Sequence, residues 1–458
     1  MCFFVCLLHF NVASSSFPVE LSISQEKRFF PHEISTYTQH VNIQIKTGSH
    51  TGTQSKLPRE LFIVLDSSGS MAGANKWNNA ISAIEHIIRN MNTDDKLHLV
   101  QYNSVSSVVF ENAHDQQAML KALHALYPSG GTNLMAGLDQ VIPLLKKYSD
   151  RSSVKRFFIL SDGQINEGIT DHNLLLKEIT TIKNTYDVTI CSFGIGYDFD
   201  EKLMTNIADY GSGDYFFIKG AESMEKVVGI AYQGFQNLMG IDAYLKVTTK
   251  YDTQIIDIYG YDIKEQEEQQ QIIPIGNLRY NDMMNILLET KVKITKELHE
   301  KSEIDFMIVE LWMTDVTDRI LKLVASKTLL FSLSRDDKEL NELNEIVQRL
   351  VELQKIQRHE REVTELLREQ RVKDAFDLSQ SLAAQAKAMK DKLADMKVSD
   401  DDRETLGYSQ RKVNTMVRRS MEMAKTFQDE SENSEKLAMV HGYYQQLNER
   451  HSDAHEDL

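Results

Sequence analysis

The sequence predicts an α/β protein in which a doubly wound, mostly parallel sheet is inserted in or followed by an antiparallel β-sandwich, with an α-helical bundle after it. Three observations predict this fold class. Residues 59–230 alternate short apolar runs with longer segments of helical periodicity. The flanking residues 17–57 and 241–335 contain runs typical of strands. Residues 336–458 contain no proline and only two glycines, the residues that most strongly break helices.

The segment 59–230 is expected to form the parallel sheet. Its apolar runs have the length of buried strands, and the segments between most of them have the length and periodicity of helices. Because parallel strands need crossover connections, the alternation indicates a sheet that helices cover on both faces. The strand candidates are LFIVL (61–65), LHLVQY (97–102), SVVFE (107–111), RFFIL (156–160), VTICSFGI (188–195) and YFFI (215–218), and helix-like stretches lie around 76–91, 115–126, 134–148, 171–185, 200–210 and 222–238.

The two flanks are expected to pair with each other in one antiparallel sandwich. One flank precedes the α/β segment and the other follows it, so this pairing would make the α/β segment an insertion. The acidic, glutamine-rich KEQEEQQQ (264–271) is expected to be a solvated hairpin tip. The strand candidates are VNIQI (41–45), AYLKV (243–247), QIIDIYG (254–260), NILLETKVKI (285–294), FMIVELWM (306–313) and ILKLVASKTLLF (320–331).

The tail is expected to be a bundle of three or four amphipathic helices. Each apolar stripe extends for only about two heptads, short of the three to four that indicate an extended coiled coil. An antiparallel bundle that docks on its own chain is therefore favoured, with self-association through the tail as the alternative. The stripes are Leu340, Leu343, Val347 and Leu350, starting near Asp336; Leu382, Ala386, Met389, Leu393 and Met396; and Val413, Val417, Met423 and Phe427, following Asp400.

Length and charge limit the domain organisation and the class of partner. A chain of 458 residues is typical of roughly two to four domains. A formal net charge of −16 would repel nucleic acid and anionic lipid, and no stretch approaches the roughly 18 apolar residues of a membrane span. We expect neither a nucleic-acid partner nor a membrane span. The expected segments are a leader (1–16), an N-terminal β segment (17–57), the α/β domain (58–240), the β-sandwich domain (241–335) and the helical C-terminal region (336–458).

Cysteine usage bears on the compartment. Cys2, Cys6 and Cys191 are too few for a disulfide framework or a cysteine zinc cluster in the body of the chain. This favours a reducing compartment, and we expect a cytoplasmic protein. The opening MCFFVCLLHFNVASSS resembles a signal peptide but lacks a basic n-region, so secretion is the alternative.

Oxygen-bearing side chains follow two of the strand candidates, where doubly wound sheets bind their ligands. Asp66, Ser68 and Ser70 occupy alternate positions of the turn DSSGS, directly after LFIVL. Asp162 follows RFFIL in the turn SDG, and Thr132 lies in the intervening loop GGTN. A DSSGS turn alone commonly only caps the next helix. Together the three loops predict five converging oxygen ligands, the kind that Mg²⁺, or Mn²⁺ in its place, prefers.

This combination resembles the von Willebrand factor A family, whose metal-ion-dependent adhesion site combines a D-x-S-x-S loop, a distant threonine and an aspartate at a strand end. All five positions match. The resemblance implies that Ser68, Ser70 and Thr132 supply hydroxyl ligands, and that Asp66 and Asp162 bind directly or through water. Only two carboxylates lie in this shell, which leaves the ion electrophilic enough to take an acidic side chain of a partner. The expected function is therefore divalent-cation-dependent protein–protein interaction, as an adhesion or scaffold module.

Other functions are kept as alternatives. No P-loop, HExxH or GxSxG motif occurs, and Gly194-Ile195-Gly196 lacks the third glycine of a dinucleotide loop because Phe199 stands there. No general base is identifiable near the five residues, so we expect a binding protein and no enzyme. More loosely, the order of segments and the IIPIGNL stretch (272–278) resemble intracellular relatives, some of which are RING-type ubiquitin ligases. The chain has too few cysteines for a RING. The alternatives are thus a non-RING component of a ubiquitin-ligase-type complex, or a structural protein whose metal only braces the fold.

Overall fold

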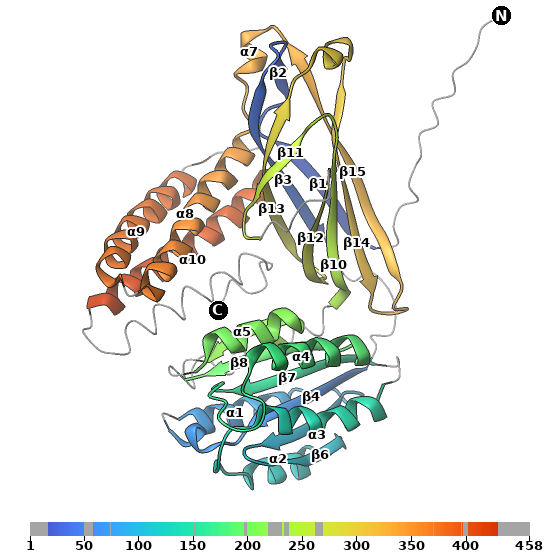
Figure 1. The fold of residues 1–458 in the computed structure, drawn as a ribbon, viewed down its shortest axis with the longest axis vertical. Coiled ribbons are helices and arrows are strands. Elements are labelled where there is room, and N and C mark those ends of the chain that lie inside the picture. The colour runs from blue at the N-terminus through green and yellow to red at the C-terminus, as the bar shows by residue number, and fades with distance from the viewer. Residues whose placement is uncertain are drawn as a thin grey trace, which may run out of the picture.

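A computed structural model shows three parts: an α/β domain, a β-sandwich and a group of helices beside the sandwich (Figure 1). The expectations for the leader (1–16), for the start of the glutamine-rich tip (264–268) and for the end of the tail (429–458) lie outside the described residues. The structure describes residues 17–49, 58–73, 75–149, 153–196, 199–218, 231–232, 238–261, 269–369, 371–394, 396 and 402–428.

The α/β domain contains a six-stranded sheet in the order β6-β5-β4-β7-β8-β9. All neighbours are parallel except β5 and β6. The chain starts in the middle with β4, continues to β5 and β6 on one side, and returns to β7, β8 and β9 on the other. The strand order therefore reverses between β4 and β7. The strands are β4 (Arg59–Asp66), β5 (Lys96–Tyr102), β6 (Ser106–Ala113), β7 (Val154–Ser161), β8 (Thr189–Ile195) and β9 (Ser212–Ile218).

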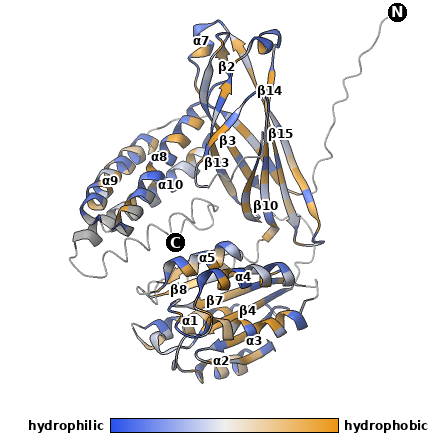
Figure 2. Cartoon of the chain, viewed as in Figure 1, coloured by the Kyte–Doolittle hydropathy of each residue, from blue (hydrophilic) through white to orange (hydrophobic). Residues whose placement is uncertain are grey.

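Helices cover both faces of this sheet, because its central strands are apolar on both faces. β4, β7 and β8 are buried along their whole length, and the central residues of β4 and β7 are apolar. Figure 2 shows hydrophobic colour in this sheet. Alternate β4 residues divide between two cores: Ile63 packs with Ile84 of α1, and Val64 packs with Leu138 of α3. The helices are α1 (Lys76–Arg89), α2 (Gln116–His124), α3 (Leu134–Lys147), α4 (His172–Tyr186) and α5 (Glu201–Tyr210).

The two flanks pair with each other in a β-sandwich, as the sequence predicts. One sheet has the order β1-β3-β13-β11 and the other β12-β10-β14-β15-β2. The pairs are antiparallel except for the short parallel pair of β15 with β2. The strands are β1 (Val19–Gln25), β2 (Phe29–Pro31), β3 (Thr36–Thr47), β10 (Leu238–Thr249), β11 (Gln254–Ile258), β12 (Gln270–Arg279), β13 (Met283–Lys293), β14 (Ile304–Asp315) and β15 (Leu321–Ser334), and one 3₁₀ turn, η2 (Lys296–Glu300), precedes β14.

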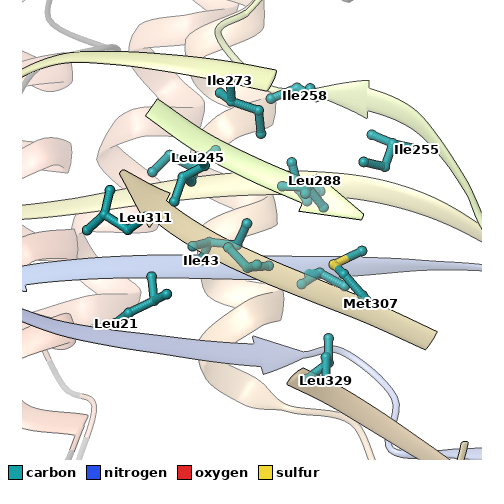
Figure 3. Close-up of a cluster of buried hydrophobic side chains, with 14 of the residues drawn as sticks. Leu21, Ile43, Leu245, Ile255, Ile258, Ile273, Leu288, Met307, Leu311 and Leu329 are labelled. Carbon is teal, nitrogen blue, oxygen red and sulfur yellow. The ribbon is translucent and has the colours of Figure 1, made fainter. Parts of the chain in front are cut away.

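The inner faces of the two sheets form one apolar core (Figure 3). Leu21, Ile43 and Leu288 enter it from the first sheet, and Leu245 and Leu311 enter it from the second. Alternation of buried and half-buried residues along β10 and β14 produces this face.

The α/β domain is an insertion in the sandwich. β3 precedes the domain in sequence, and its partner β13 follows it; the two strands pair from Met283↔Lys46 to Lys293↔Thr36. Ion pairs also join the two parts: Arg279 of β12 contacts Asp214 of β9 at 2.8 Å, and Lys183 of α4 contacts Asp242 of β10 at 3.1 Å. Among the described residues, no helix is long and apolar enough to cross a membrane.

The C-terminal helices pack against one another and on the outer face of the first sheet. Met283 of β13 belongs to the same apolar cluster as Leu350 and Leu382, and Val347 packs with Leu287. The expectation of docking on the chain itself is met by these helices. They are α8 (Glu345–Arg368), α9 (Val372–Ala394) and α10 (Arg403–Gln428), and the short helix α7 (Asp337–Leu340) lies beside β2.

The start of the tail differs from the prediction. Leu340 ends the short helix α7, and Leu343 lies in the following loop, so neither extends the buried stripe of α8. The side chain of Asn344 accepts hydrogen bonds from the N–H groups of Ile346 (3.0 Å) and Val347 (3.2 Å). An asparagine that caps the first free N–H groups starts a new helix. The prediction of one apolar stripe from Leu340 to Leu350 was therefore wrong, because two helices meet at this point.

Candidate metal centre

The candidate site lies where the strand order of the α/β sheet reverses. β4 ends at Asp66 and β7 ends at Ser161, so the loops that follow these adjacent parallel strands leave the same edge of the sheet. At such a point the two loops diverge and leave room for a ligand. The first loop continues into the 3₁₀ turn η1 (Gly69–Ala72), and the second carries Asp162.

Asp66 is a fully buried carboxylate held in a fixed orientation. Its Oδ1 accepts the N–H of Ser68 at 2.8 Å, and its Oδ2 accepts the hydroxyls of Ser161 (2.6 Å) and Tyr102 (3.4 Å). Burial raises the pKa of Asp66 to about 6, against the lowering effect of these hydrogen bonds, and the nearby charge of Asp162 raises it further. A buried carboxylate of this kind is stabilised by an adjacent cation.

The hydroxyl donors lie on loops that backbone hydrogen bonds connect. The Oγ atoms of Ser68 and Ser70 are 3.0 Å apart. The N–H of Gly69 donates to the carbonyl of Gly130 at 3.0 Å, which joins this loop to the loop of Thr132. Thr132 is itself buried. The arrangement brings the Thr132 loop alongside the Ser68–Ser70 turn.

Asn166 connects the Thr132 loop to the loop that follows β7. Its side-chain oxygen accepts the N–H of Thr132 at 2.8 Å, and its own N–H donates to the carbonyl of Thr132 at 3.1 Å. All three loops predicted to carry ligands are therefore fastened together at one edge.

Asp162 is also fully buried, and a lysine contacts it. Nζ of Lys76, from the start of α1, lies 3.1 Å from Oδ2 of Asp162. The other carboxylate oxygen accepts the N–H of Gln164 at 3.4 Å. The carbonyl of Asp162 accepts the N–H of Asp200, which caps α5 and lies 3.4 Å from His172.

The donor set fits a small, hard dication. Two carboxylates and three hydroxyls are oxygen donors of the kind Mg²⁺ and Mn²⁺ accept, with coordination positions left for water. Among the described residues, no three His, Cys, Asp or Glu side chains lie close enough together to hold a metal ion. A zinc site would require such a group. Asp66, Ser68, Ser70, Thr132 and Asp162 are thus the residues that would hold the ion.

Several residues of this site were not predicted from the sequence. Ser161 and Tyr102 orient Asp66, Asn166 holds the Thr132 loop, and Lys76 contacts Asp162. Ser161 precedes Asp162 at a strand end, which is a signal that could have been used. Lys76 gives another, because a cation in the first turn of a helix is electrostatically unfavourable unless an anion compensates it.

Comparison with known proteins agrees with this fold. Residues 60–229 match the family description "von Willebrand factor type A domain". The chain therefore contains a von Willebrand factor type A domain, inserted in a β-sandwich that also carries helices.

Similar sequences share this domain with the chain. The uncharacterized protein sll0103 of Synechocystis is 28% identical over 192 residues, which are 42% of this chain and 44% of that protein. A von Willebrand factor A domain-containing protein of Dictyostelium discoideum is 30% identical over 37% of this chain and 18% of its own length. Inter-alpha-trypsin inhibitor heavy chain H2 of Mus musculus is 26% identical over 34% of this chain and 17% of its own. The matches span less than half of these relatives.

Two solved structures resemble most of the chain in fold. The von Willebrand factor type A protein from Catenulispora acidiphila has a TM-score of 0.61 at 16% identity and covers 84% of this chain and 91% of its own. The ArnB paralog VWA2 from Sulfolobus acidocaldarius has a TM-score of 0.58 at 14% identity, with 95% and 100% covered. At these identities the likeness extends to the fold alone. It reaches beyond the inserted domain to the sandwich and helices.

Proposed function

We propose that the protein binds a partner protein through a divalent cation held by Asp66, Ser68, Ser70, Thr132 and Asp162. One observation carries the proposal: two fully buried carboxylates and three hydroxyl-bearing residues lie on three interconnected loops at the edge where the strand order reverses. When bound, Mg²⁺ or Mn²⁺ supplies an electrophilic position for the carboxylate of an acidic side chain.

The surrounding residues prepare the site for this role. Ser161 and Tyr102 fix the orientation of the Asp66 carboxylate, so binding requires little reorganisation there. Asn166 holds the main chain of Thr132 on both its N–H and its carbonyl. The ligands are thus positioned by the sheet and by the connected loops, while the apolar strands beneath them form the core.

Exposed apolar side chains near the loops support a protein as the ligand. Val105 is 71% exposed and Tyr127 is 72% exposed. Val105 adjoins Ser104, whose Oγ accepts the N–H of Gly131 at 2.8 Å, and Tyr127 precedes the same glycine loop. Large apolar side chains placed in water beside a polar site are typical of contacts made with a partner.

The test compares partner capture with Mg²⁺ and with chelator, using the full chain. We expect capture to be lost in chelator and in Thr132→Ala, while circular dichroism shows an unchanged fold. Asp139→Asn is the matched control, because Asp139 is exposed on α3 of the same domain. The double variant Val105→Ser/Tyr127→Ser should weaken capture but leave Mg²⁺ binding intact. Equal capture with and without Mg²⁺ would sink the proposal.

Two alternatives predict other outcomes. If the metal only braces the fold, Thr132→Ala will lose its structure in the same circular dichroism measurement. If the protein is a metal-dependent hydrolase, His172, which lies 3.4 Å from Asp200, is a candidate for a base, and His172→Ala would abolish turnover. A role as a non-RING component of a ubiquitin-ligase-type complex would appear as ligase subunits among the captured partners.

For the compartment we keep the proposal of a cytoplasmic protein, with secretion as the alternative. Cys191 is buried in β8 as a free thiol, which is compatible with a reducing environment. Immunofluorescence of the chain tagged at its C-terminus, compared with a variant that lacks residues 1–16, distinguishes the two.

A further inference from the structure

Lys76 stands at a position where a helix does not favour a lysine. It is the first residue of α1, and its N-cap, Asn75, has a left-handed backbone (φ 59°) with no side-chain cap. The first turn of α1 contains no acidic residue. The N-terminal end of a helix carries partial positive charge, so a lysine there is unfavourable by itself. The reason for this lysine must therefore be sought outside the helix.

The side chain of Lys76 is directed into the candidate metal centre. Its Nζ lies 3.1 Å from Oδ2 of Asp162, and the two side chains are 3% and 0% exposed. An ammonium so fully removed from water is stable only when an anion contacts it. This buried ion pair is formed within the set of residues that would hold the cation.

Gly196 provides the space through which Lys76 reaches the site. Gly196 follows the end of β8 with φ +86°, a conformation that favours glycine. A Cβ atom at this position would lie 2.6 Å from Cε of Lys76 and 3.2 Å from its Cδ and Cγ. Gly196, the last residue of the Gly194-Ile195-Gly196 stretch, thus accommodates the aliphatic part of the Lys76 side chain. This contact explains the glycine at position 196 without a dinucleotide ligand.

We propose that the positive charge of Lys76 sets the charge of the metal centre. It lowers the affinity of the centre for the cation and raises the affinity of the cation-loaded centre for the acidic group of the partner. The inference rests on the proposed function. The carboxylates of Asp66 and Asp162 alone would balance the charge of a bound dication. The ammonium of Lys76 leaves one positive charge in excess, at a buried position where charges are poorly screened.

Two opposite effects follow for a variant that lacks this charge. Lys76→Met keeps an unbranched side chain of similar length over Gly196 but removes the positive charge. We expect it to bind Mg²⁺ about tenfold more tightly or better, since the ion no longer meets a like charge. The loaded site should bind a carboxylate about tenfold more weakly, because the excess positive charge is gone. If Lys76 had only a structural role, its replacement would not raise the Mg²⁺ affinity while lowering the carboxylate affinity.

The experiment uses the full chain and two simple probes. Mg²⁺ alone is titrated by calorimetry, and acetate is titrated into the Mn²⁺-loaded protein while the paramagnetic broadening of its methyl resonance is followed by NMR. Lys121→Met is the matched control, because it removes one positive charge at an exposed position of α2 in the same domain. We expect wild-type behaviour from Lys121→Met in both titrations.

The outcomes separate this inference from the proposed function. A wild-type chain that binds no Mg²⁺ contradicts the proposed function itself. A wild-type chain that binds Mg²⁺, together with a folded Lys76→Met that binds Mg²⁺ and acetate as the wild type does, overturns the role of Lys76. If Lys76→Met does not fold, Lys76→Gln answers the question, because its amide still donates to Asp162 and is uncharged.

Discussion

Asp66 should make the proposed cation binding dependent on pH. Burial raises its pKa from 3.8 to about 6 in the metal-free chain. A carboxylate whose pKa is raised by folding stabilises the fold in its protonated form. That contribution is fully present below pH 3.8 and is lost as the pH rises through 6. A cation binds the ionised form, so proton and cation compete for Asp66.

We therefore predict that the Mg²⁺ affinity of the chain falls as the pH decreases through about 6. Calorimetric titrations between pH 5 and pH 8 measure it, and below the pKa each unit of pH should lower the affinity about tenfold. Asp66→Ala and Thr132→Ala should show no heat of Mg²⁺ binding at any pH. An affinity that is constant over this range would contradict the assignment of Asp66 as a ligand.

Cys191 offers a second prediction at the scale of one residue. Burial raises the pKa of its thiol to about 11, and its Sγ accepts the N–H of Asp214 at 3.4 Å. Only the thiolate reacts with disulfide reagents, so the native thiol should be unreactive at pH 8. In a Cys2→Ser/Cys6→Ser background, Ellman's reagent should detect no thiol until denaturant is added. Rapid labelling of the native chain would show that β8 opens readily.

At the scale of elements, periodicity allowed most strands and helices to be predicted. The six strands of the α/β sheet lie where the apolar runs are, because a strand covered on both faces is mostly apolar. β1 and β2 were missed, and the end of the expected solvated tip was wrong, because Gln270 and Gln271 begin β12 and Gln271 is buried. β1 has few large apolar residues, and the three-residue β2 is defined only by its pairing with β15. That pairing is a long-range contact which no local pattern indicates.

The site was predictable to the extent that its residues follow strand ends. Asp66 ends an apolar strand, and Asp162 immediately follows one. Ser68, Ser70 and Thr132 were predicted from the order of the three loops along the chain. The five ligands stay a prediction, which the titrations above test. The role of Asn166 could not be predicted, because it depends on which loops meet in space, and the position of Lys76 in a first helical turn does not identify Asp162 as its partner.

The cap of α8 gives a prediction at this scale. Asn344 accepts two helix N–H groups, and its own N–H donates to the carbonyl of Glu26 at 2.9 Å. Asn344→Ala removes the side-chain cap, and we expect the free energy of unfolding to fall by about 1 kcal/mol. Urea denaturation followed by circular dichroism measures this. The exposed Glu342→Ala is the control and should change the stability little.

At the scale of the whole molecule, a buried ion pair joins the inserted domain to the sandwich. Arg279 of β12 donates to Asp214 of β9, and Arg156 lies 3.8 Å from the same carboxylate. Both arginines and the aspartate are buried. Arg279 and Asp214 lie on different parts of the chain, so this contact exists only while the two parts stay together.

We predict that Arg279→Met destabilises the chain by on the order of 2 kcal/mol, because the buried Asp214 loses its nearer partner. The urea midpoint of the full chain should fall, and limited proteolysis should release the α/β domain sooner than in the wild type. Arg335→Met, at an exposed position after β15, is the control. An unchanged midpoint would mean that this contact does not couple the two parts.

The insertion also decides how the molecule bears a mechanical load. β3 and β10, which lead into and out of the inserted domain, are interior strands: β3 pairs with β1 and β13, and β10 pairs with β12 and β14. A pull on the inserted domain therefore reaches both sheets of the sandwich at once. Extracting either strand means breaking a row of backbone hydrogen bonds on each of its sides together. Tension on the inserted domain therefore acts on β3 in one sheet and on β10 in the other at the same time. Because neither is an edge strand, the load does not begin at one edge of the sandwich.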